Sequence, residues 1–307
     1  MSGVKIGIGF GQWQYGLPGP DLLCDYAEAA EAVGLDSIWL SDHTVTRNPS
    51  LDITCLFAMI AARTRRVKMG PSVLTLPTRH PVQVAKTYAT LDYISGGRMI
   101  MAVGSGGDLR ELHACGVPVE NRGARLDEGI IILRKLWTES HVTHHGRFYD
   151  FEDVTIEPKP GKGALDIWIG GRSDAILKRT ARLGDGWFPA LTSPAEFKRD
   201  MDKIIAFGRE YGRTMNPREA GVLLFAYVTD DHERARQVMA PFVRALPMPP
   251  EEAAARCVVG PAAECVEKLR RFVDAGCVKF VLRPSCPPAE VMSQIELYGK
   301  EILPHFN

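Results

Sequence analysis

The sequence has no long hydrophobic run and no paired cysteine motif, and each absence excludes a class of protein. None of its apolar stretches approaches the roughly 20 residues that a membrane-spanning helix needs. The seven cysteines are scattered without a C-x-x-C pair, which is typical of small core residues in a reducing compartment. No signal-peptide pattern precedes the first strand. We therefore expect a cytoplasmic protein that has no membrane partner.

The sequence also lacks an excess of charge of either sign. Lys plus Arg and Asp plus Glu both number 37, so the formal net charge is zero. Broad binding to nucleic acid needs a clustered excess of cations, so the composition argues against a nucleic-acid partner. Hydrophobic residues make up 45% of the chain, as in ordinary globular proteins with a full core. The partner that remains is a small-molecule substrate.

The stretch 67–107 predicts a strand, a helix and a second strand in succession. Residues 67–76 and 98–103 are apolar enough for strands that are buried on both faces. Between them, residues 82–94 carry apolar side chains at three- and four-residue spacing, which predicts a crossover helix. Both strands end in small residues. The backbone is therefore open at their carboxyl ends, where α/β folds bind ligands.

The same alternation continues along the whole chain. We predict strands at 4–10, 37–40, 67–76, 98–103, 166–169, 186–189, 221–228 and 277–282. We predict helices at 21–33, 53–62, 82–94, 121–137, 174–183, 194–211, 231–246, 262–275 and 289–302. Residues 141–160 form an excursion with a short hairpin, and LPMPPEE is a Pro-rich break. Eight strands alternating with helices predict one (β/α)8 TIM barrel domain over 1–307, with insertion segments.

The carboxyl ends of barrel strands carry the chemistry in this fold, so the residues that follow each strand are the candidates. The second strand ends in Ser41, Asp42 and His43, and an imidazole there can accept or donate a proton. The first strand leads into polar and aromatic residues, which form either a Gly-rich turn or an aromatic wall over a planar ligand. These candidate substrate-binding residues are Phe10, Gln12 and Trp13.

The fifth strand is followed by a possible anion site. Gly170, Gly171, Arg172 and Ser173 open a helix, so free N–H groups, the helix dipole and a guanidinium could all face a phosphate. The alternative is a plain turn in which Ser173 only caps the helix. The paired glycines favour the phosphate.

Two histidine-containing stretches fit structural roles better. His144 and His145 lie in the excursion without a partner at helical spacing, so we predict no metal site there. The Arg79-His80-Pro81 segment is typical of residues that fix a loop.

Four blocks of the sequence resemble the luciferase-like monooxygenase superfamily, which includes FMN-dependent and coenzyme F420-dependent enzymes. The blocks are AEAAEAVGLDSIWLSDH, VKMGPSVLTLPTRHPVQVAKTYATLDYISGGRMIMAVGSGG, GARLDEGIIILRKLW with GRFYDFEDVTIEPKP, and IWIGGRSDAILKRTARLGDGWFP. They occur in the family's order over nearly the whole chain. The resemblance implies a bacterial-luciferase-like (β/α)8 barrel with insertions.

The resemblance also implies the place of the cofactor. Ser72 and Val73 would lie beneath the ring, joined by a non-proline cis peptide bond, and His43 would lie near its reactive face. The remaining cofactor-binding residues would be Ser41 and Asp42 after the second strand, Gly104, Ser105 and Gly106 beside the ring, and Gly170, Gly171, Arg172 and Ser173 at the phosphate.

The resemblance leaves three functions open. The first is an FMN-dependent monooxygenase that uses reduced flavin and O2 on a small organic substrate. A separate flavin reductase would serve it, because the sequence has no GxGxxG nicotinamide motif. The second is an F420-dependent oxidoreductase that transfers a hydride. It would need a cationic groove for the polyglutamate tail, to which Arg172, Lys178, Arg179 and Arg182 could contribute. The third is a flavin-binding barrel without activity.

Several features bear on these alternatives. The retained Ser41, Asp42 and His43 argue against an inactive barrel, and FMN monooxygenation is the function that we place first. Gly107 stands where the F420-dependent sugar-phosphate dehydrogenases carry a Glu, which puts their substrate in doubt here. The resemblance further implies a homodimer that pairs through the helices after the second and third strands.

Overall fold

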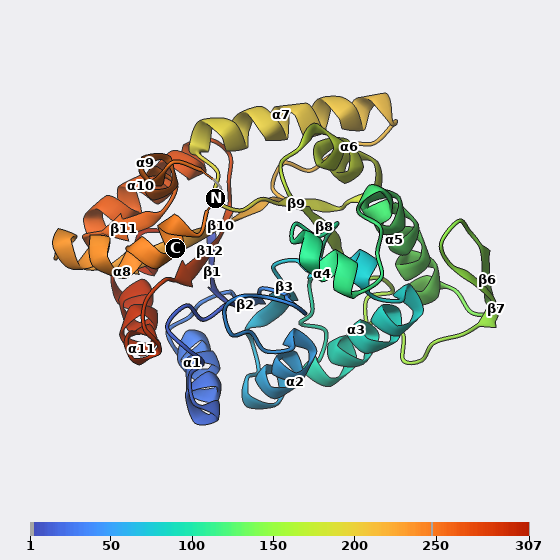
Figure 1. The fold of residues 1–307 in the computed structure, drawn as a ribbon, viewed down its shortest axis with the longest axis horizontal. Helices are drawn as coiled ribbons and strands as arrows, with labels where there is room; N and C mark the ends of the chain where they lie inside the picture. The colour runs from blue at the N-terminus through green and yellow to red at the C-terminus, as the bar shows by residue number, and fades with distance from the viewer. Residues whose placement is uncertain (1–2, 247, 307) are drawn as a thin grey trace.

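The computed structural model describes residues 3–246 and 248–306, and in these residues the strands close into a barrel (Figure 1). Neighbouring strands of the barrel pair in parallel. The bridges Met69–Met99 and Ala190–Leu223 join the two sheets and complete the ring. The strands are β1 (Lys5–Phe10), β2 (Ser37–Leu40), β3 (Lys68–Pro71) with β4 (Leu74–Thr75), β5 (Met101–Gly104), β8 (Ile167–Gly170), β9 (Gly186–Phe188), β10 (Gly221–Val228) and β12 (Lys279–Pro284). The structure thus confirms the (β/α)8 barrel.

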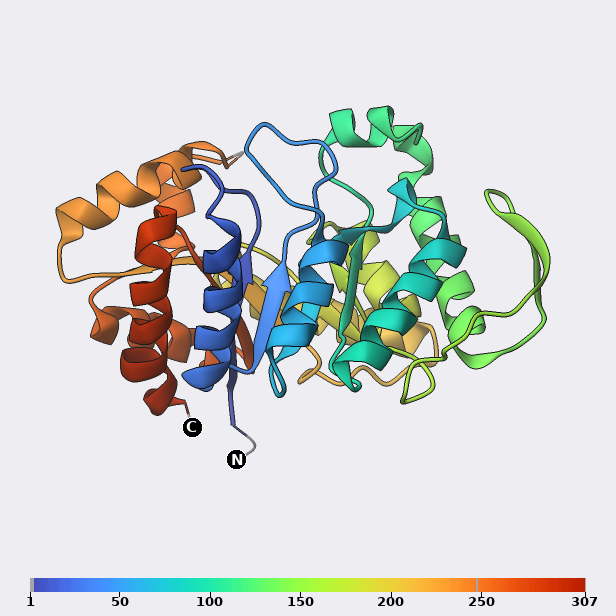
Figure 2. The ribbon, with the colours of Figure 1, turned by 90° about the horizontal axis from the view of Figure 1, so that it is seen from below.

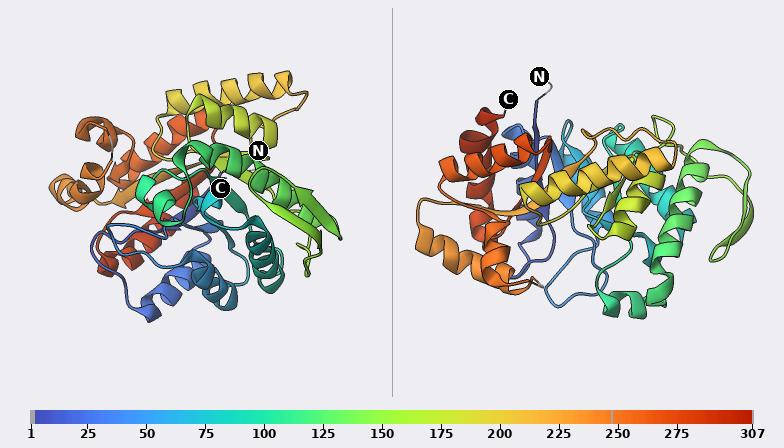
Figure 3. Two further views of the ribbon diagram at one scale, coloured as in Figure 1. Left: turned by 45° about the vertical axis from the view of Figure 1, so that its right-hand side comes forward. Right: turned by 90° about the horizontal axis from the view of Figure 1, so that it is seen from above.

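Helices surround the barrel, and several begin at side chains that cap their free N–H groups. Asp52 accepts the N–H of Thr54, and Ser193 forms a reciprocal capping box with Glu196. Figure 3 shows α7 running along the outside of the barrel next to α6. The helices of this layer are α1 (Pro20–Ala32), α2 (Ile53–Arg63), α3 (Pro81–Ser95), α5 (Arg122–Thr138), α6 (Asp174–Leu183), α7 (Pro194–Glu210), α8 (His232–Arg244), α10 (Ala262–Asp274) and α11 (Pro288–Leu297).

Short elements depart from the simple alternation, and most of them were not predicted. The hairpin of β6 (Val142–His145) and β7 (Asp150–Val154), which was predicted, projects from one side of the barrel (Figures 1 and 2). The additional elements are α4 (Leu109–Ala114), α9 (Pro250–Ala255), β11 (Val258–Gly260), the 3-10 turns Leu76–Thr78, Val119–Asn121 and Leu303–His305, and the π turn Tyr298–Ile302. They are too short to produce a periodic apolar pattern.

The Pro-rich segment LPMPPEE, predicted as a break in regular structure, overlaps the start of the helix α9. Pro250 opens α9, because a proline fits the first turn of a helix, where its missing N–H has no helical partner. Pro247, in the same segment, lies outside the described residues. The short strand β11 then pairs in parallel with the carboxyl half of β10, outside the barrel ring.

Large side chains fill the interior of the barrel. The rings of Trp39 and Phe188 stack with their centroids 4.5 Å apart. Lys279 places its ammonium 5.4 Å from the Trp39 ring and 2.9 Å from a carboxylate oxygen of Asp36. In Figure 2 the two ends of the described chain lie at the lower edge and α4 lies at the upper edge. Because α4 follows the end of β5, the upper edge is the side on which the strands end and on which barrels of this kind bind ligands. No helix in the described part of the chain combines the length and apolarity needed to cross a membrane.

Candidate active site

A cavity of about 450 Å³ opens at the carboxyl ends of β2, β4, β5 and β8. Most of the predicted catalytic and cofactor-binding residues line it, although they come from four separate parts of the sequence. They are Asp42, His43, Ser72, Val73, Gly104, Ser105, Gly106, Gly170, Gly171, Arg172 and Ser173. Ser41 does not line the cavity. It lies behind Ser72, with 3.4 Å between the two hydroxyl oxygens.

Val73 forms part of the wall of this cavity, and two glycines make room for it. The strand predicted over 67–76 is divided into β3 and β4, and the Ser72–Val73 peptide bond between them is cis, as the resemblance implied. A Cβ atom on Gly104 or on Gly170 would lie 2.7 Å from a methyl carbon of Val73. These glycines are therefore required by the Val73 side chain itself, which the sequence pattern did not reveal.

Asp42 is held by three hydrogen bonds and is not free to bind a ligand with its carboxylate. Its two oxygens accept from Arg79 at 2.7 and 2.8 Å, and Oδ2 also accepts the N–H of Thr75 at 3.1 Å. The carboxylate is almost fully buried, with 2% of the side chain exposed. The structure thus confirms that Arg79 fixes a loop, and it shows that Asp42 ties the end of β2 to the start of the next connection.

His43 lies half-buried at the edge of the cavity. Burial lowers the pKa of its imidazole, because the charged form loses solvation, and the nearby cation Arg283 lowers that pKa further. The carboxylates of Glu111 and Asp42 act in the opposite direction but do not outweigh burial. His43 is therefore neutral at pH 7, and a neutral imidazole can accept a proton.

Glu111 is a residue of this site that the sequence analysis missed. It lies on α4, is 2% exposed, borders the cavity and accepts a hydrogen bond from the N–H of Thr44, directly after His43. The sequence did contain a signal for the start of α4. Asp108 caps this helix by accepting the N–H of Arg110, and Glu111 follows it at the three-residue spacing of a capping box.

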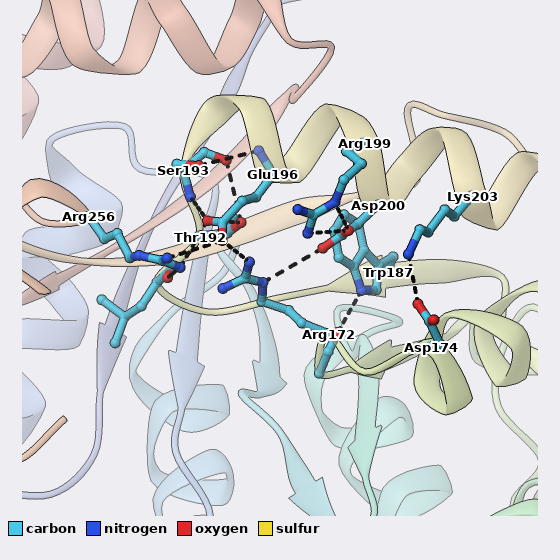
Figure 4. A network of polar contacts seen from close by, with 12 residues as sticks. Arg172, Asp174, Trp187, Thr192, Ser193, Glu196, Arg199, Asp200, Lys203 and Arg256 are labelled. Atoms are coloured by element: carbon cyan, nitrogen blue, oxygen red, sulfur yellow. Dashed lines mark hydrogen bonds and ion pairs between the residues drawn. The ribbon is translucent and has the colours of Figure 1, made fainter. Parts of the chain in front are cut away.

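The predicted phosphate site has the expected backbone, but its arginine is already paired. Gly171 has a φ of +119°, which few other residues adopt, and the Ser173 hydroxyl caps α6. Arg172 lies 2.6 Å from a carboxylate oxygen of Glu196 and 3.7 Å from one of Asp200 (Figure 4). The glycine backbone and Ser173 could therefore hold a phosphate, whereas the charge of Arg172 is shared with two carboxylates.

Glu196 is the centre of this network. It also lies 2.9 Å from Arg256 and accepts the N–H of Ser193 at 2.8 Å (Figure 4). Burial by itself would raise the pKa of Glu196, but the Ser193 N–H and the Arg172 guanidinium outweigh it and lower the pKa to about 2. The carboxylate is charged at neutral pH and holds β8, α7 and the segment before β11 together.

The cationic groove expected for a polyglutamate tail is largely neutralised. Arg179 and Arg182 both pair with Asp127, the latter at 2.6 Å. Lys178 lies over the ring of Phe207 at 5.2 Å. The physical reason is helical geometry, which turns these side chains toward neighbouring helices and away from a common groove.

The predicted substrate-binding residues lie away from the large cavity. The rings of Phe10 and Trp13 stack 6.1 Å apart and also pack against Tyr26, so they belong to the buried core. The side-chain oxygen of Gln12 accepts a hydrogen bond from Asn48 at 3.3 Å. These residues border a narrow cleft beside Arg283 and do not form an open aromatic wall.

The two histidines of the hairpin each contact a carboxylate. His144 lies 3.1 Å from Glu128, and His145 lies 3.0 Å from Asp150. Over residues 3–246 and 248–306, no three side chains of His, Cys, Asp or Glu gather in a way that could hold a metal ion.

Comparison with known proteins identifies the family. Residues 2–279 match the family model of the luciferase-like monooxygenases. The chain belongs to this family. A curated member from Amycolatopsis mediterranei, an F420-dependent glucose-6-phosphate dehydrogenase, is 30% identical over 89% of this chain and 90% of its own length. A second such dehydrogenase, from Nakamurella multipartita, is 30% identical over 93% of this chain and 92% of its own.

Solved structures share the fold at lower identity. An F420-dependent secondary alcohol dehydrogenase in complex with an F420-acetone adduct matches with a TM-score of 0.85 at 22% identity, over 99% of this chain and 100% of that chain. The monooxygenase RslO1 from Streptomyces bottropensis matches with a TM-score of 0.83 at 23% identity, over 98% and 99% of the two chains. The family model describes monooxygenases and these curated relatives are dehydrogenases, so this protein is an oxidoreductase.

Proposed function

We propose that this protein is an F420-dependent oxidoreductase that transfers a hydride between the deazaflavin and a small organic substrate. The curated luciferase-like relatives from Amycolatopsis and Nakamurella are F420-dependent dehydrogenases that are similar over nearly their whole length. The cofactor of these relatives supports F420 as the cofactor here. FMN, the cofactor that was placed first on the sequence alone, becomes the second candidate.

The residues around the cavity fit the ring and the phosphate of such a cofactor, whereas the groove predicted for its polyglutamate tail is largely neutralised. The volume of the cavity, about 450 Å³, lies within the usual range of small-molecule sites. Val73 would support the ring, and the backbone around Gly104 to Gly106 would lie at its edge. Gly171 and Ser173, at the amino-terminal end of α6, would hold the phosphate.

His43 carries the proposal, because it presents a neutral imidazole to the cavity. When bound, the deazaflavin supplies the position that accepts or donates the hydride. In the oxidation of an alcohol, His43 accepts the hydroxyl proton while the carbon loses its hydride, and a carbonyl product is left. Asp42 and Glu111 position His43 by fixing the backbone on either side of it.

The second candidate remains an FMN-dependent monooxygenase. It is favoured by the shared fold of two monooxygenases, RslO1 and the oxygenating constituent of 3,6-diketocamphane monooxygenase in complex with FMN. A reductase partner would then be needed to supply the reduced flavin.

Titration with each cofactor tests the choice. We expect F420 to bind at least 10-fold more tightly than FMN, measured by the change in F420 and FMN fluorescence on binding. Tighter binding of reduced FMN, together with oxygen consumption, would contradict the proposal and favour the monooxygenase.

A further inference from the structure

Two buried polar atoms beside the cavity have no hydrogen-bond partner within residues 3–246 and 248–306. They are Nε of Arg172 and Oδ2 of Asp200. The two atoms lie 3.7 Å apart, so their charges attract but the distance is too long for a hydrogen bond (Figure 4). Asp200 is 1% exposed, and a buried polar atom that lacks a partner costs free energy. Arg172 and Asp200 therefore do not satisfy each other in this structure.

Arg172 is held less firmly than the other arginine of the same network. Its Nη2 lies 2.6 Å from Glu196, and its side chain is 26% exposed and lines the cavity. Arg256 is 12% exposed and donates to Glu196 at 3.0 Å and to the carbonyl oxygen of Leu191 at 3.1 Å. Arg256 is thus fixed in place, whereas Arg172 borders open space.

The two carboxylates that contact Arg172 have other cationic partners. Glu196 retains its ion pair with Arg256. Asp200 accepts through Oδ1 from Nε of Arg199 at 2.8 Å, and the same oxygen lies 2.7 Å from the Nη2 of Arg199 (Figure 4). Arg172 can therefore move away without leaving either carboxylate unpaired.

A different partner for Arg172 would lie on the cavity side. Gly171 and Ser173, which would hold the phosphate, are its neighbours in sequence and line the same cavity. Glu196 and Asp200 belong to α7 and do not line it. A phosphate can accept two N–H groups of one guanidinium at the same time. It would supply the partner that Nε lacks here.

We propose that Arg172 exchanges partners when the cofactor binds. It leaves the carboxylates of Glu196 and Asp200 and pairs with the phosphate of the cofactor. Asp200 is then a positioning residue that acts through Arg172, because it neutralises the guanidinium in the free protein and competes with the phosphate for it. The inference rests on the proposed function in that it places a phosphate-bearing cofactor in the cavity, and both F420 and FMN carry a phosphate.

Removal of the competing charge tests this exchange. Asp200→Asn keeps the shape of the side chain and should bind F420 at least 3-fold more tightly than the wild-type protein, measured by fluorescence titration. Asp202→Asn is the matched control, because it makes the same change in net charge at an exposed carboxylate of α7 and should leave the affinity unchanged. Unchanged or weaker F420 binding in Asp200→Asn would overturn the proposal.

A double variant shows whether Asp200 acts through Arg172. Arg172→Gln should weaken F420 binding at least 10-fold. In that background Asp200→Asn should change the affinity less than 2-fold, because no arginine remains to be released. An equal gain with and without Arg172 would show that Asp200 only repels the phosphate through space, and it would overturn the exchange.

Riboflavin and FMN differ by the phosphate alone, so they separate this inference from the proposed function. The gain in Asp200→Asn should appear with FMN and be absent with riboflavin, and the same gain with riboflavin would overturn the exchange. If FMN binds more tightly than F420 and still shows the gain, the proposed function fails and the exchange stands. If F420 is preferred but shows no gain, the reverse holds.

The wild-type protein provides a test that does not depend on the folding of Asp200→Asn. The NMR signal of the Nε–H group of Arg172, assigned by its absence in Arg172→Lys, should move when FMN is added and stay in place when riboflavin is added. A signal that FMN leaves unchanged would overturn the proposal.

Discussion

The residues around His43 show how a site can contain several ionisable groups of which one is free to react. Asp42 is occupied by Arg79 and by the N–H of Thr75. Glu111 accepts the N–H of Thr44. Among the described residues, no hydrogen bond engages the imidazole of His43, so it can exchange a proton with a ligand in the cavity.

Replacement of His43 by Ala tests this role directly. We expect turnover of a substrate to fall by roughly 10²-fold or more, the usual effect of losing a positioned acid or base. The dissociation constant for F420 should change little, because His43 borders the cavity without supporting it. His113→Ala, on an exposed histidine of α4, is the control. Normal turnover with weakened F420 binding would assign His43 to cofactor binding instead.

The pH dependence of turnover should report the protonation state of His43. Its pKa is lowered below the ordinary value of 6.5, so the neutral, proton-accepting form is lost only as the pH falls below that value. In alcohol oxidation, kcat/KM should therefore be constant above pH 7 and decline in a more acidic range. The Glu111 carboxylate raises this pKa, so Glu111→Gln should move the decline to still lower pH. A shift to higher pH in a pH–rate profile would contradict the assignment.

At the scale of elements, the contact of β5 and β8 with Val73 shapes the cavity wall. Gly104→Ala should destabilise the protein by about 1–3 kcal/mol, because its Cβ would lie 2.7 Å from a Val73 methyl carbon. The double variant Gly104→Ala with Val73→Ala removes that methyl and should recover most of the loss. Denaturant unfolding measures both, and a double variant no more stable than Gly104→Ala would show that the strain lies elsewhere.

The turn between β8 and α6 should determine cofactor affinity. Gly171→Asp places a carboxylate where N–H groups would face the phosphate, and the repulsion should cost on the order of 2 kcal/mol, about 30-fold in affinity. The positive φ of Gly171 also strains any side chain at this position. Gly171→Asn shares that strain without the charge and is therefore the matched control. Equal F420 affinity in the two variants would place the phosphate elsewhere.

At the scale of the whole molecule, two helices expose apolar surface that a second copy could cover. Ala58 is exposed on α2, and Tyr93 and Ile94 are 71% and 50% exposed at the end of α3. The homodimer expected from the resemblance would pair through these helices.

Light scattering coupled to size-exclusion chromatography tests that expectation. The protein should elute as a dimer at micromolar concentration, and Ala58→Glu should shift it toward the monomer by burying a charge at the interface. Ala255→Glu, on an exposed alanine of α9, should leave the dimer intact. A monomeric wild-type protein would exclude this assembly.

The sequence by itself determined the barrel and most of the predicted residues that line its cavity. Buried strands and crossover helices have different apolar periods, and both are local properties that can be read along the chain. The segments 174–183 and 221–228 were predicted at the bounds that the structure gives them. The residues that follow β2, β5 and β8 were predictable for the same reason, because their place depends only on where each strand ends.

Only the tertiary structure decided which of these residues are already engaged. The pairing of Arg172 with Glu196 joins residues 24 positions apart in sequence, and that of Arg283 with the carbonyl of Gln12 joins residues 271 apart. Neither partner is fixed by a local pattern, since each depends on how strands and helices pack in the closed barrel. Glu111 likewise became part of the site because α4 folds over the end of β2. The sequence thus determined which groups are present at the barrel mouth, and packing determined which of them remain free to bind or react.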